Sequence, residues 1–392
     1  MKLKTGSVAG LTILVSIFAS LLILEIGIRV FVPRSHWDFR DATDNWQPDP
    51  LTGWVQKPNL DIIEKTDHGW MVHFQTNEDG LAPPTASKTK VAGKKRIMIF
   101  GDSTVTGRAV PQDQTVTACL NQLLEKQGLN AEVINCGVEG YSTDQVLLRL
   151  EQLVPIYRPD LAFYCLCDND FGGNVSSEVF GWPKPVFKLL PDGSLEMSPP
   201  DLHKRVHKNL GPVRYVQYSA LYRFLQPAIM VLRAKLGNWQ DRNLLGLAPE
   251  MFYSAADMEQ IDWQLFLALL VKMKEVCAQN GAQFLLYTHP SLGEVWEPFI
   301  RETEKAKGLK PGQYDRLALE KRLQQIAAEE KFTFIPLVPY FQAHQSEGPF
   351  HLLPRDPHCN PTGYRLTAEV LAAHYSKLLS GAPITKFRET YN

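Results

Sequence analysis

The strongest constraint on the fold is a nearly unbroken apolar run at residues 161–167, Leu-Ala-Phe-Tyr-Cys-Leu-Cys. A strand that is apolar at almost every position is covered on both faces, which is typical of parallel sheets flanked by helices. Further β-prone runs at 97–100, 131–135, 283–287 and 332–337 alternate with segments of helical periodicity. The chain is therefore predicted to adopt an α/β fold, a three-layer αβα sandwich around a parallel five-stranded sheet.

Breaks in this alternation indicate how the chain is organised. Residues 33–92 are rich in Trp, Pro, Asp and Asn and are predicted to form a small β-rich segment and a linker. The main α/β domain is predicted to span 93–392, with an insertion at about 171–249 that does not fit the repeating strand–helix unit. A helix-like piece at 218–236 lies within that insertion.

The amino terminus is the least globular part of the chain. Residues 5–24 carry no charge and are mostly apolar, about the ~20 residues that a helix needs to cross a bilayer. The helical pattern continues to Val32, so residues 1–32 are predicted to be an uncleaved transmembrane anchor that contacts the lipid bilayer through 5–32. A cleaved signal peptide is the alternative, but no small-x-small cleavage site follows the apolar stretch.

Basic residues lie on both sides of this segment, so charge alone leaves its orientation open. We expect a single-pass membrane protein whose α/β domain lies outside the cytoplasm, in the periplasm or at the cell surface. The net charge of the 392 residues is −1, and no basic run is interleaved with aromatic residues, which argues against nucleic acid as a partner. The six cysteines and the His, Asp and Glu residues show no metal-site spacing, so we expect neither a metal nor another cofactor.

The tripeptide Gly101-Asp102-Ser103 follows the strand at 97–100 and places a serine at the carboxyl edge of the sheet. A serine hydroxyl becomes a nucleophile when a base takes its proton, and a neutral imidazole suits that task near pH 7. His358 lies in a loop at the same predicted edge, and Asp356, two residues before it, can orient the imidazole. Ser103, His358 and Asp356 are the predicted catalytic triad.

Two other strand ends offer donors for an oxyanion. Gly140 follows the strand at 131–135, and Asn169 follows the strand at 161–167. Together with the backbone N–H of Ser103, the Gly140 N–H and the Asn169 carboxamide are predicted to form a three-donor oxyanion hole. Ordinary turn roles are the alternative for both residues. Asp102, Asp170 and His289 are further candidates for substrate binding at this edge.

The ordered set Gly101-Asp102-Ser103, Gly140, Asn169 and Asp356/His358 resembles the four sequence blocks of the SGNH (GDSL) hydrolase superfamily. This resemblance covers roughly 94–178 and 255–380, and it implies a flavodoxin-like αβα fold, Ser-His-Asp esterase chemistry and the residue roles given above. The last block is shortened, because only one residue separates Asp356 from His358. In this respect it is similar to some membrane-anchored and polysaccharide-modifying members.

We therefore expect a membrane-anchored serine esterase that hydrolyses acyl esters. The expected substrate is an O-acetyl group on carbohydrate, and the expected partner is a small-molecule or glycan ester. Two alternatives stay open: an O-acyltransferase acting on polysaccharide, and a non-catalytic protein that binds or scaffolds envelope polysaccharide. Aromatic residues of the insertion could line either an acyl or a sugar site: Phe171, Phe180, Trp182 and Phe187.

Overall fold

The structure is a computed structural model of the 392-residue chain. It describes residues 5–32, 45–66, 70–204, 219–222, 224–225, 258–308, 310, 314–352 and 356–380. Contacts divide the chain into two units, one of residues 1–44 and 207–247 and one of residues 45–206 and 248–392. The predicted β-rich segment, from residue 45 onward, therefore falls in the same unit as the sheet.

The larger unit is built on a parallel sheet, as predicted. Its five strands in the described chain are β5 (Lys95–Phe100), β6 (Ala131–Asn135), β7 (Leu161–Leu166), β12 (Gln283–Thr288) and β13 (Thr333–Ile335). Their spatial order is β13-β12-β7-β5-β6, and every neighbouring pair is parallel. Read in chain order this is 2-1-3-4-5, the flavodoxin-like arrangement, whose switch point lies between the first and third strands. Ligands of such sheets bind where β5 and β7 end.

Alternate residues of each strand point to opposite faces, because the side-chain period of a strand is two. In β5, Met98 and Phe100 join the core on one face, whereas Ile97 and Ile99 join the core on the other. β7 is buried at all six positions, which explains why its sequence is almost continuously apolar.

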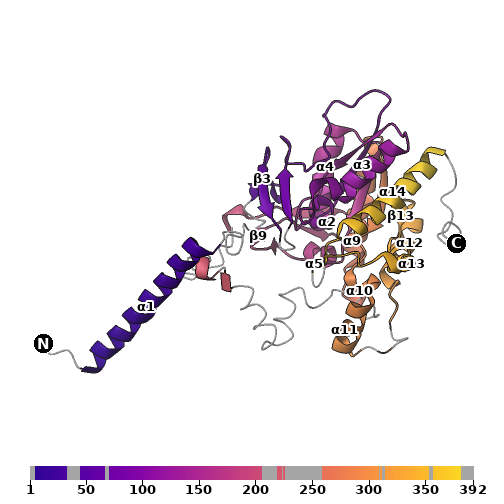
Figure 1. The fold of residues 1–392 in the computed structure, drawn as a ribbon. Coiled ribbons are helices and arrows are strands. Elements are labelled where there is room, and N and C mark those ends of the chain that lie inside the picture. Colours follow the sequence, from indigo (N-terminus) through magenta and orange to yellow (C-terminus); the bar gives the residue numbers. More distant parts are fainter. Residues whose placement is uncertain are drawn as a thin grey trace. The chain divides into compact units, whose positions relative to one another are not determined.

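Helices cover both faces of the sheet (Figure 1). On one face α4 (Thr143–Tyr157) packs against α9 (Trp263–Gln279), and α12 (Ala318–Glu330) follows at the β13 edge. On the other face α3 (Val116–Lys126) packs against α14 (Pro361–Ser380). Within the described residues, this unit also has the helices α2 (Ser103–Thr106), α5 (Asn169–Asn174), α10 (Leu292–Val295), α11 (Glu297–Lys307) and α13 (Val338–Ala343). Short 3₁₀ turns lie at Gln112–Gln114, Leu202–Lys204 and Gln345–Glu347.

Two-stranded hairpins form the segment before β5 and the start of the insertion. They pair β1 (Trp46–Asp49) with β2 (Gly53–Gln56), β3 (Asp61–Lys65) with β4 (Met71–Gln75), β8 (Glu178–Val179) with β9 (Trp182–Pro183), and β10 (Val186–Leu189) with β11 (Leu195–Ser198). All are antiparallel, and β1 to β4 lie in the segment before β5. Most of the predicted helix-like piece at 218–236 lies outside the described residues.

The predicted anchor region forms the helix α1, Thr5–Phe31, in the smaller unit (Figure 1). It carries an i,i+4 ion pair near its end, in which Arg29 Nε lies 2.7 Å from Glu25 Oε1. The Glu25 carboxylate also accepts hydrogen bonds from the backbone N–H groups of Ala220 and Leu221, both at 2.9 Å. Within the part of the chain that the structure describes, no helix combines the length and the apolar character needed to cross a bilayer, so the predicted transmembrane anchor is not supported.

Candidate active site

Ser103 begins the short helix α2 directly after β5, at the end of the sheet where the strand order reverses. The Asp102 side chain caps this helix by accepting a hydrogen bond from the backbone N–H of Thr104 at 2.9 Å. The turn is so tight that a Cβ on Gly101 would lie 2.6 Å from Val105 Cγ2 and 3.1 Å from the Cys165 side chain. Glycine at 101 therefore lets the serine turn pack closely against β7.

The structure brings together the three residues of the predicted triad. His358 Nε2 lies 2.8 Å from Ser103 Oγ, and His358 Nδ1 lies 2.5 Å from Asp356 Oδ1. The same carboxylate oxygen accepts a hydrogen bond from the backbone N–H of His358 at 2.9 Å. Asp356 thus reaches the imidazole across the single intervening residue, because the backbone folds into a turn that points both side chains the same way.

This arrangement sets the protonation of His358. Burial among neighbouring atoms lowers the pKa of His358, but the hydrogen bond and the charge of Asp356 outweigh burial, so its pKa lies above the usual histidine value. Because a carboxylate only accepts hydrogen bonds, Nδ1 of His358 carries a proton. In the neutral ring Nε2 then has a lone pair directed at the Ser103 hydroxyl, which is the tautomer that general-base chemistry requires.

The predicted oxyanion donors lie at the ends of the neighbouring strands. Gly140 has a φ of +75°, a conformation that glycine adopts without strain, in the loop after β6. Among the described residues, the backbone N–H groups of Ser103 and Gly140 donate no hydrogen bond. Asn169 opens α5 after β7, and its Nδ2 lies 3.4 Å from Asp102 Oδ2. Asp102 therefore contacts both the serine turn and the carboxamide.

The three residues predicted to bind substrate lie in different settings. Asp102 is 3% exposed, with its carboxylate directed at Thr104 and Asn169. Asp170 is buried in the first turn of α5, where its carboxylate accepts hydrogen bonds from the Tyr164 hydroxyl at 2.7 Å and the Cys167 N–H at 3.0 Å. Burial, followed by the charge of Asp102, raises the pKa of Asp170 well above its usual range. These contacts are structural ones within the base of the site.

His289, the third residue predicted to bind substrate, is half-buried at the end of β12. Its Nε2 lies 3.1 Å from the carbonyl oxygen of Pro357, the residue between Asp356 and His358. It also belongs to the one group in the described chain that could hold a metal ion, together with His351 and Cys359. Sequence spacing did not indicate this group, because its members come from two loops that are 60 residues or more apart in the chain.

The residues that hold the Gly140 loop could not be identified from the sequence. Trp54 in β2 donates from Nε1 to the carbonyl oxygen of Glu139 at 3.0 Å, and the Tyr141 hydroxyl donates to the carbonyl oxygen of Trp54 at 2.6 Å. The Glu139 carboxylate lies 3.3 Å from Trp46 Nε1. Trp46 and Trp54 stack with ring centroids 5.2 Å apart. The β1–β2 hairpin thus fixes the position of the residue before Gly140.

Only one of the four candidate aromatic side chains of the insertion is exposed. Phe180 is 75% exposed on the turn between β8 and β9, and a Cβ on Gly140 would lie 3.2 Å from its ring. Phe171 packs against Phe266 in the core with ring centroids 4.9 Å apart, and Trp182 packs edge-on against Trp46 at 5.7 Å. Phe187 is also buried. Phe180 is therefore the aromatic surface next to the predicted oxyanion donors.

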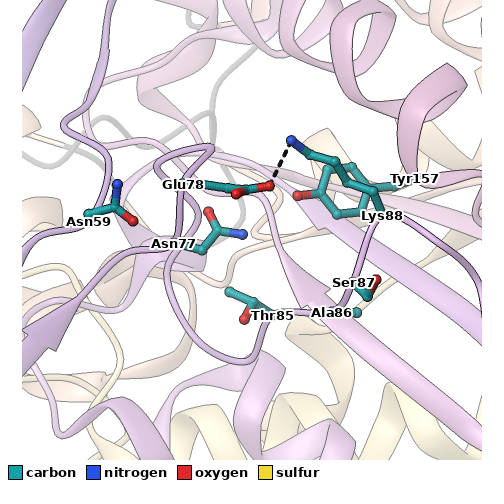
Figure 2. A pocket seen from close by; sticks show the side chains of 8 residues that line it. All are labelled: Asn59, Asn77, Glu78, Thr85, Ala86, Ser87, Lys88 and Tyr157. Atoms are coloured by element: carbon teal, nitrogen blue, oxygen red, sulfur yellow. Dashed lines mark ion pairs between the residues drawn. The ribbon is translucent and has the colours of Figure 1, made fainter.

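The structure has a further polar pocket of about 470 Å³, and Figure 2 shows the side chains that line it. It is lined by Asn59, Asn77, Glu78, Thr85, Ala86, Ser87, Lys88 and Tyr157. The Lys88 ammonium lies 2.9 Å from Glu78 and 3.0 Å from Asp79. Its lining includes none of the predicted triad or oxyanion residues, so the pocket is not part of the candidate active site.

Comparison with known proteins gives one family. The model of the GDSL-like lipase/acylhydrolase family matches residues 99–366, a stretch that includes every residue of the candidate triad and oxyanion hole. No curated protein matches the chain.

The chain is also similar to several solved structures, at low identity and low TM-score. An acetyl xylan esterase, AlAXEase, is 14% identical with a TM-score of 0.39, over 71% of this chain and 98% of that one. The psychrotrophic esterase EstA from Pseudoalteromonas sp. is 11% identical with a TM-score of 0.36, over 73% and 100%. A GDSL-like lipase from Bacteroides thetaiotaomicron is 13% identical with a TM-score of 0.37, over 75% and 93%.

Proposed function

This chain belongs to the GDSL-like lipase/acylhydrolase family and is a serine esterase of that type, and from this premise we propose that Ser103, His358 and Asp356 carry out its ester hydrolysis. The observation that supports these roles is the continuous line of contacts from Ser103 Oγ through the imidazole to Asp356, at 2.8 Å and 2.5 Å. Nucleophile, base and orienting carboxylate lie in the order that acyl transfer requires.

In the first half of the reaction His358 Nε2 takes the hydroxyl proton of Ser103 while Oγ attacks the carbonyl carbon of the ester. The C=O electron pair moves onto oxygen and forms an oxyanion. Asp356 stabilises the imidazolium, which then gives its proton to the departing alcohol as the C–O bond breaks. The products of this half are a free alcohol and an acyl group on Ser103.

In the second half a water molecule takes the place of the alcohol. His358 removes its proton, the hydroxide attacks the acyl carbon, and collapse of the second oxyanion returns the electron pair and proton to Ser103 Oγ. The N–H groups of Ser103 and Gly140 and the Asn169 carboxamide stabilise both oxyanions. Losing one such donor typically costs about 2.7–4 kcal/mol in the barrier.

We further propose that the natural substrate is a short acyl ester, an O-acetyl group, on a carbohydrate. The exposed Phe180 ring beside Gly140 supports this choice, because it offers a flat apolar surface for a sugar ring while restricting the space beside the oxyanion. The single residue between Asp356 and His358, similar to the spacing in polysaccharide-modifying members, also supports it.

The mechanism is tested with Ser103→Ala and p-nitrophenyl acetate, using Ser376→Ala on α14 as the matched control. We expect Ser103→Ala to lose esterase activity at an unchanged circular dichroism spectrum, and Ser376→Ala to keep it. Wild-type activity in the folded Ser103→Ala variant would contradict the proposed nucleophile.

The substrate is tested separately. We expect p-nitrophenyl acetate and acetylated sugars to be hydrolysed faster than octanoate esters, and Phe180→Ala to raise KM for acetylated sugars more than for p-nitrophenyl acetate. A preference for octanoate would contradict the acetyl proposal. Acetate release with an acceptor glycan present supports hydrolysis, whereas an acetylated acceptor would indicate transfer, which uses the same acyl-enzyme.

A further inference from the structure

Two histidines and a cysteine converge beneath the loop that carries Asp356 and His358. His289 comes from the end of β12, whereas His351 and Cys359 face each other in an antiparallel bridge. A ligand atom from each of the three lies within 4.8 Å of the others, and Cys359 Sγ lies 4.0 Å from His289 Nδ1. His351 and Cys359 are buried and His289 is half-buried, so the group can be reached from the His289 side.

The backbone fixes the tautomer of both histidines. His351 Nε2 lies 2.7 Å from the carbonyl oxygen of Pro290, and His289 Nε2 lies 3.1 Å from the carbonyl oxygen of Pro357. A carbonyl oxygen only accepts hydrogen bonds, so each Nε2 carries the proton and each Nδ1 of a neutral ring is unprotonated. The Nδ1 lone pair of His289 faces Cys359 Sγ. A histidine that donates its second ring N–H to a backbone carbonyl is the usual arrangement around metal-bound imidazoles.

The second observation is an orphaned buried nitrogen. His351 is 2% exposed, and its Nδ1 has no hydrogen-bond partner within the described residues. A buried polar atom without a partner typically costs about 1–3 kcal/mol, so such atoms are rare in folded proteins. A cation bound to the His351 Nδ1 lone pair removes that cost. The neighbouring groups satisfy it less well, because a cysteine S–H is a weak donor and the Nδ1 of a second neutral histidine has no proton to donate.

We propose that His289 Nδ1, His351 Nδ1 and Cys359 Sγ form a binding site for a divalent transition ion of the Zn²⁺ class. Two imidazoles and one thiolate are typical Zn²⁺ ligands, with bond lengths of about 2.0–2.1 Å to nitrogen and ~2.3 Å to sulfur. These lengths place tetrahedral ligand atoms about 3.3–3.6 Å apart. Small side-chain rotations that draw the three atoms together by about 1 Å therefore complete the site.

Binding is balanced by loss of a proton. The Cys359 S–H bond breaks, the thiolate electron pair binds the ion, and the proton leaves to solvent. The fourth coordination position is open to water. Because His289 also holds the Pro357 carbonyl and Cys359 follows His358 directly, the ion fixes the loop on which the proposed base and its carboxylate lie. Ion binding itself does not rest on the proposed function.

Cobalt(II) provides the test, because a thiolate bound to it gives an intense near-ultraviolet charge-transfer band. The full chain is first freed of metal with a chelator and then titrated with Co²⁺. We expect one equivalent to produce the band, excess Zn²⁺ to remove it, and Zn²⁺ to raise the temperature of unfolding. Absence of the band in the folded wild-type chain at saturating Co²⁺ would overturn the proposal.

Variants locate the site. Cys359→Ser is expected to abolish the charge-transfer band. His351→Gln is expected to weaken Co²⁺ binding at least ~10-fold. The control Cys119→Ser on α3 is expected to leave the band and the Co²⁺ affinity unchanged. A band that survives in Cys359→Ser and disappears in Cys119→Ser would contradict the assignment. Ser103→Ala should bind Co²⁺ like the wild type, so failure of the proposed esterase mechanism and failure of the metal site give different results.

Discussion

Replacing Asp356 by Asn tests whether a carboxylate two residues before the histidine serves as the orienting member of the triad. Asp356 Oδ1 accepts hydrogen bonds from both Nδ1 and the backbone N–H of His358. Asparagine keeps the shape of this contact and removes its charge. The perturbation therefore isolates the attraction between the carboxylate and the imidazolium, which exists only while His358 holds the proton of Ser103.

The size of this attraction follows from the geometry. With charge centres about 4 Å apart and an effective dielectric constant of about 20, a unit-charge pair gains about 4 kcal/mol. The side chains of His358 and Asp356 are 27% and 25% exposed, so solvent screens part of this energy, and about 3 kcal/mol is the expected share. That value corresponds to a loss of about 10²-fold in kcat/KM.

The assay is steady-state hydrolysis of p-nitrophenyl acetate, with Asp192→Asn in an exposed turn as the matched control. We expect Asp356→Asn to lower kcat by about the factor given above with little change in KM, since the interaction strengthens in the transition state. The control should match the wild type. Activity of Asp356→Asn within twofold of the wild type would contradict the proposed role of the carboxylate and remove Asp356 from the mechanism.

Three further substitutions test other parts of the structure. Gly140 has a φ of +75°, and a Cβ there would lie 3.2 Å from Phe180. Gly140→Ala should therefore lower kcat about 10²-fold and the unfolding free energy by about 1–2 kcal/mol. Wild-type kinetics would exclude the Gly140 N–H from the oxyanion hole. Lys184→Met removes the ammonium that lies 2.5 Å from the buried Asp144 carboxylate. It should lower the unfolding free energy measured in urea by about 3–5 kcal/mol. An unchanged unfolding free energy would show that the ion pair is dispensable. Burial raises the pKa of Glu294 to about 8, so its contribution to stability is largest below about pH 4.5 and falls as pH rises toward 8. The unfolding free energy of Glu294→Gln should therefore rise relative to that of the wild type by about 1.4 kcal/mol per pH unit between pH 5 and 8. Parallel pH profiles of the two unfolding free energies would contradict this.

The sheet could be predicted from the sequence because its strands are buried on both faces. The continuous apolar run of β7 and the strand ends at Ser103, Gly140 and Asn169 are local signals, and parallel strands bring their carboxyl ends to one edge. The predicted α/β fold with a parallel five-stranded sheet and the predicted family are confirmed. The catalytic roles and the localisation stay predictions.

Features that depend on contacts between distant segments could not be predicted. Trp54 holds the Glu139 carbonyl from 85 residues earlier in the chain, and a tryptophan in a short hairpin gives no sequence signal of that partner. His289, His351 and Cys359 meet only because β12 and the loop before α14 end side by side. The apolar amino-terminal segment predicted a helix correctly, but the structure does not support the membrane anchor that we inferred from it.

The most direct test of the central claim is the rate and position of labelling by a fluorophosphonate probe. We expect one adduct, located at Ser103 by peptide mass spectrometry. We also expect a labelling rate at least ~10²-fold lower in His358→Ala, because the base that activates the hydroxyl is gone. An adduct at a different serine, an unlabelled wild-type chain, or an unchanged rate in His358→Ala would contradict it.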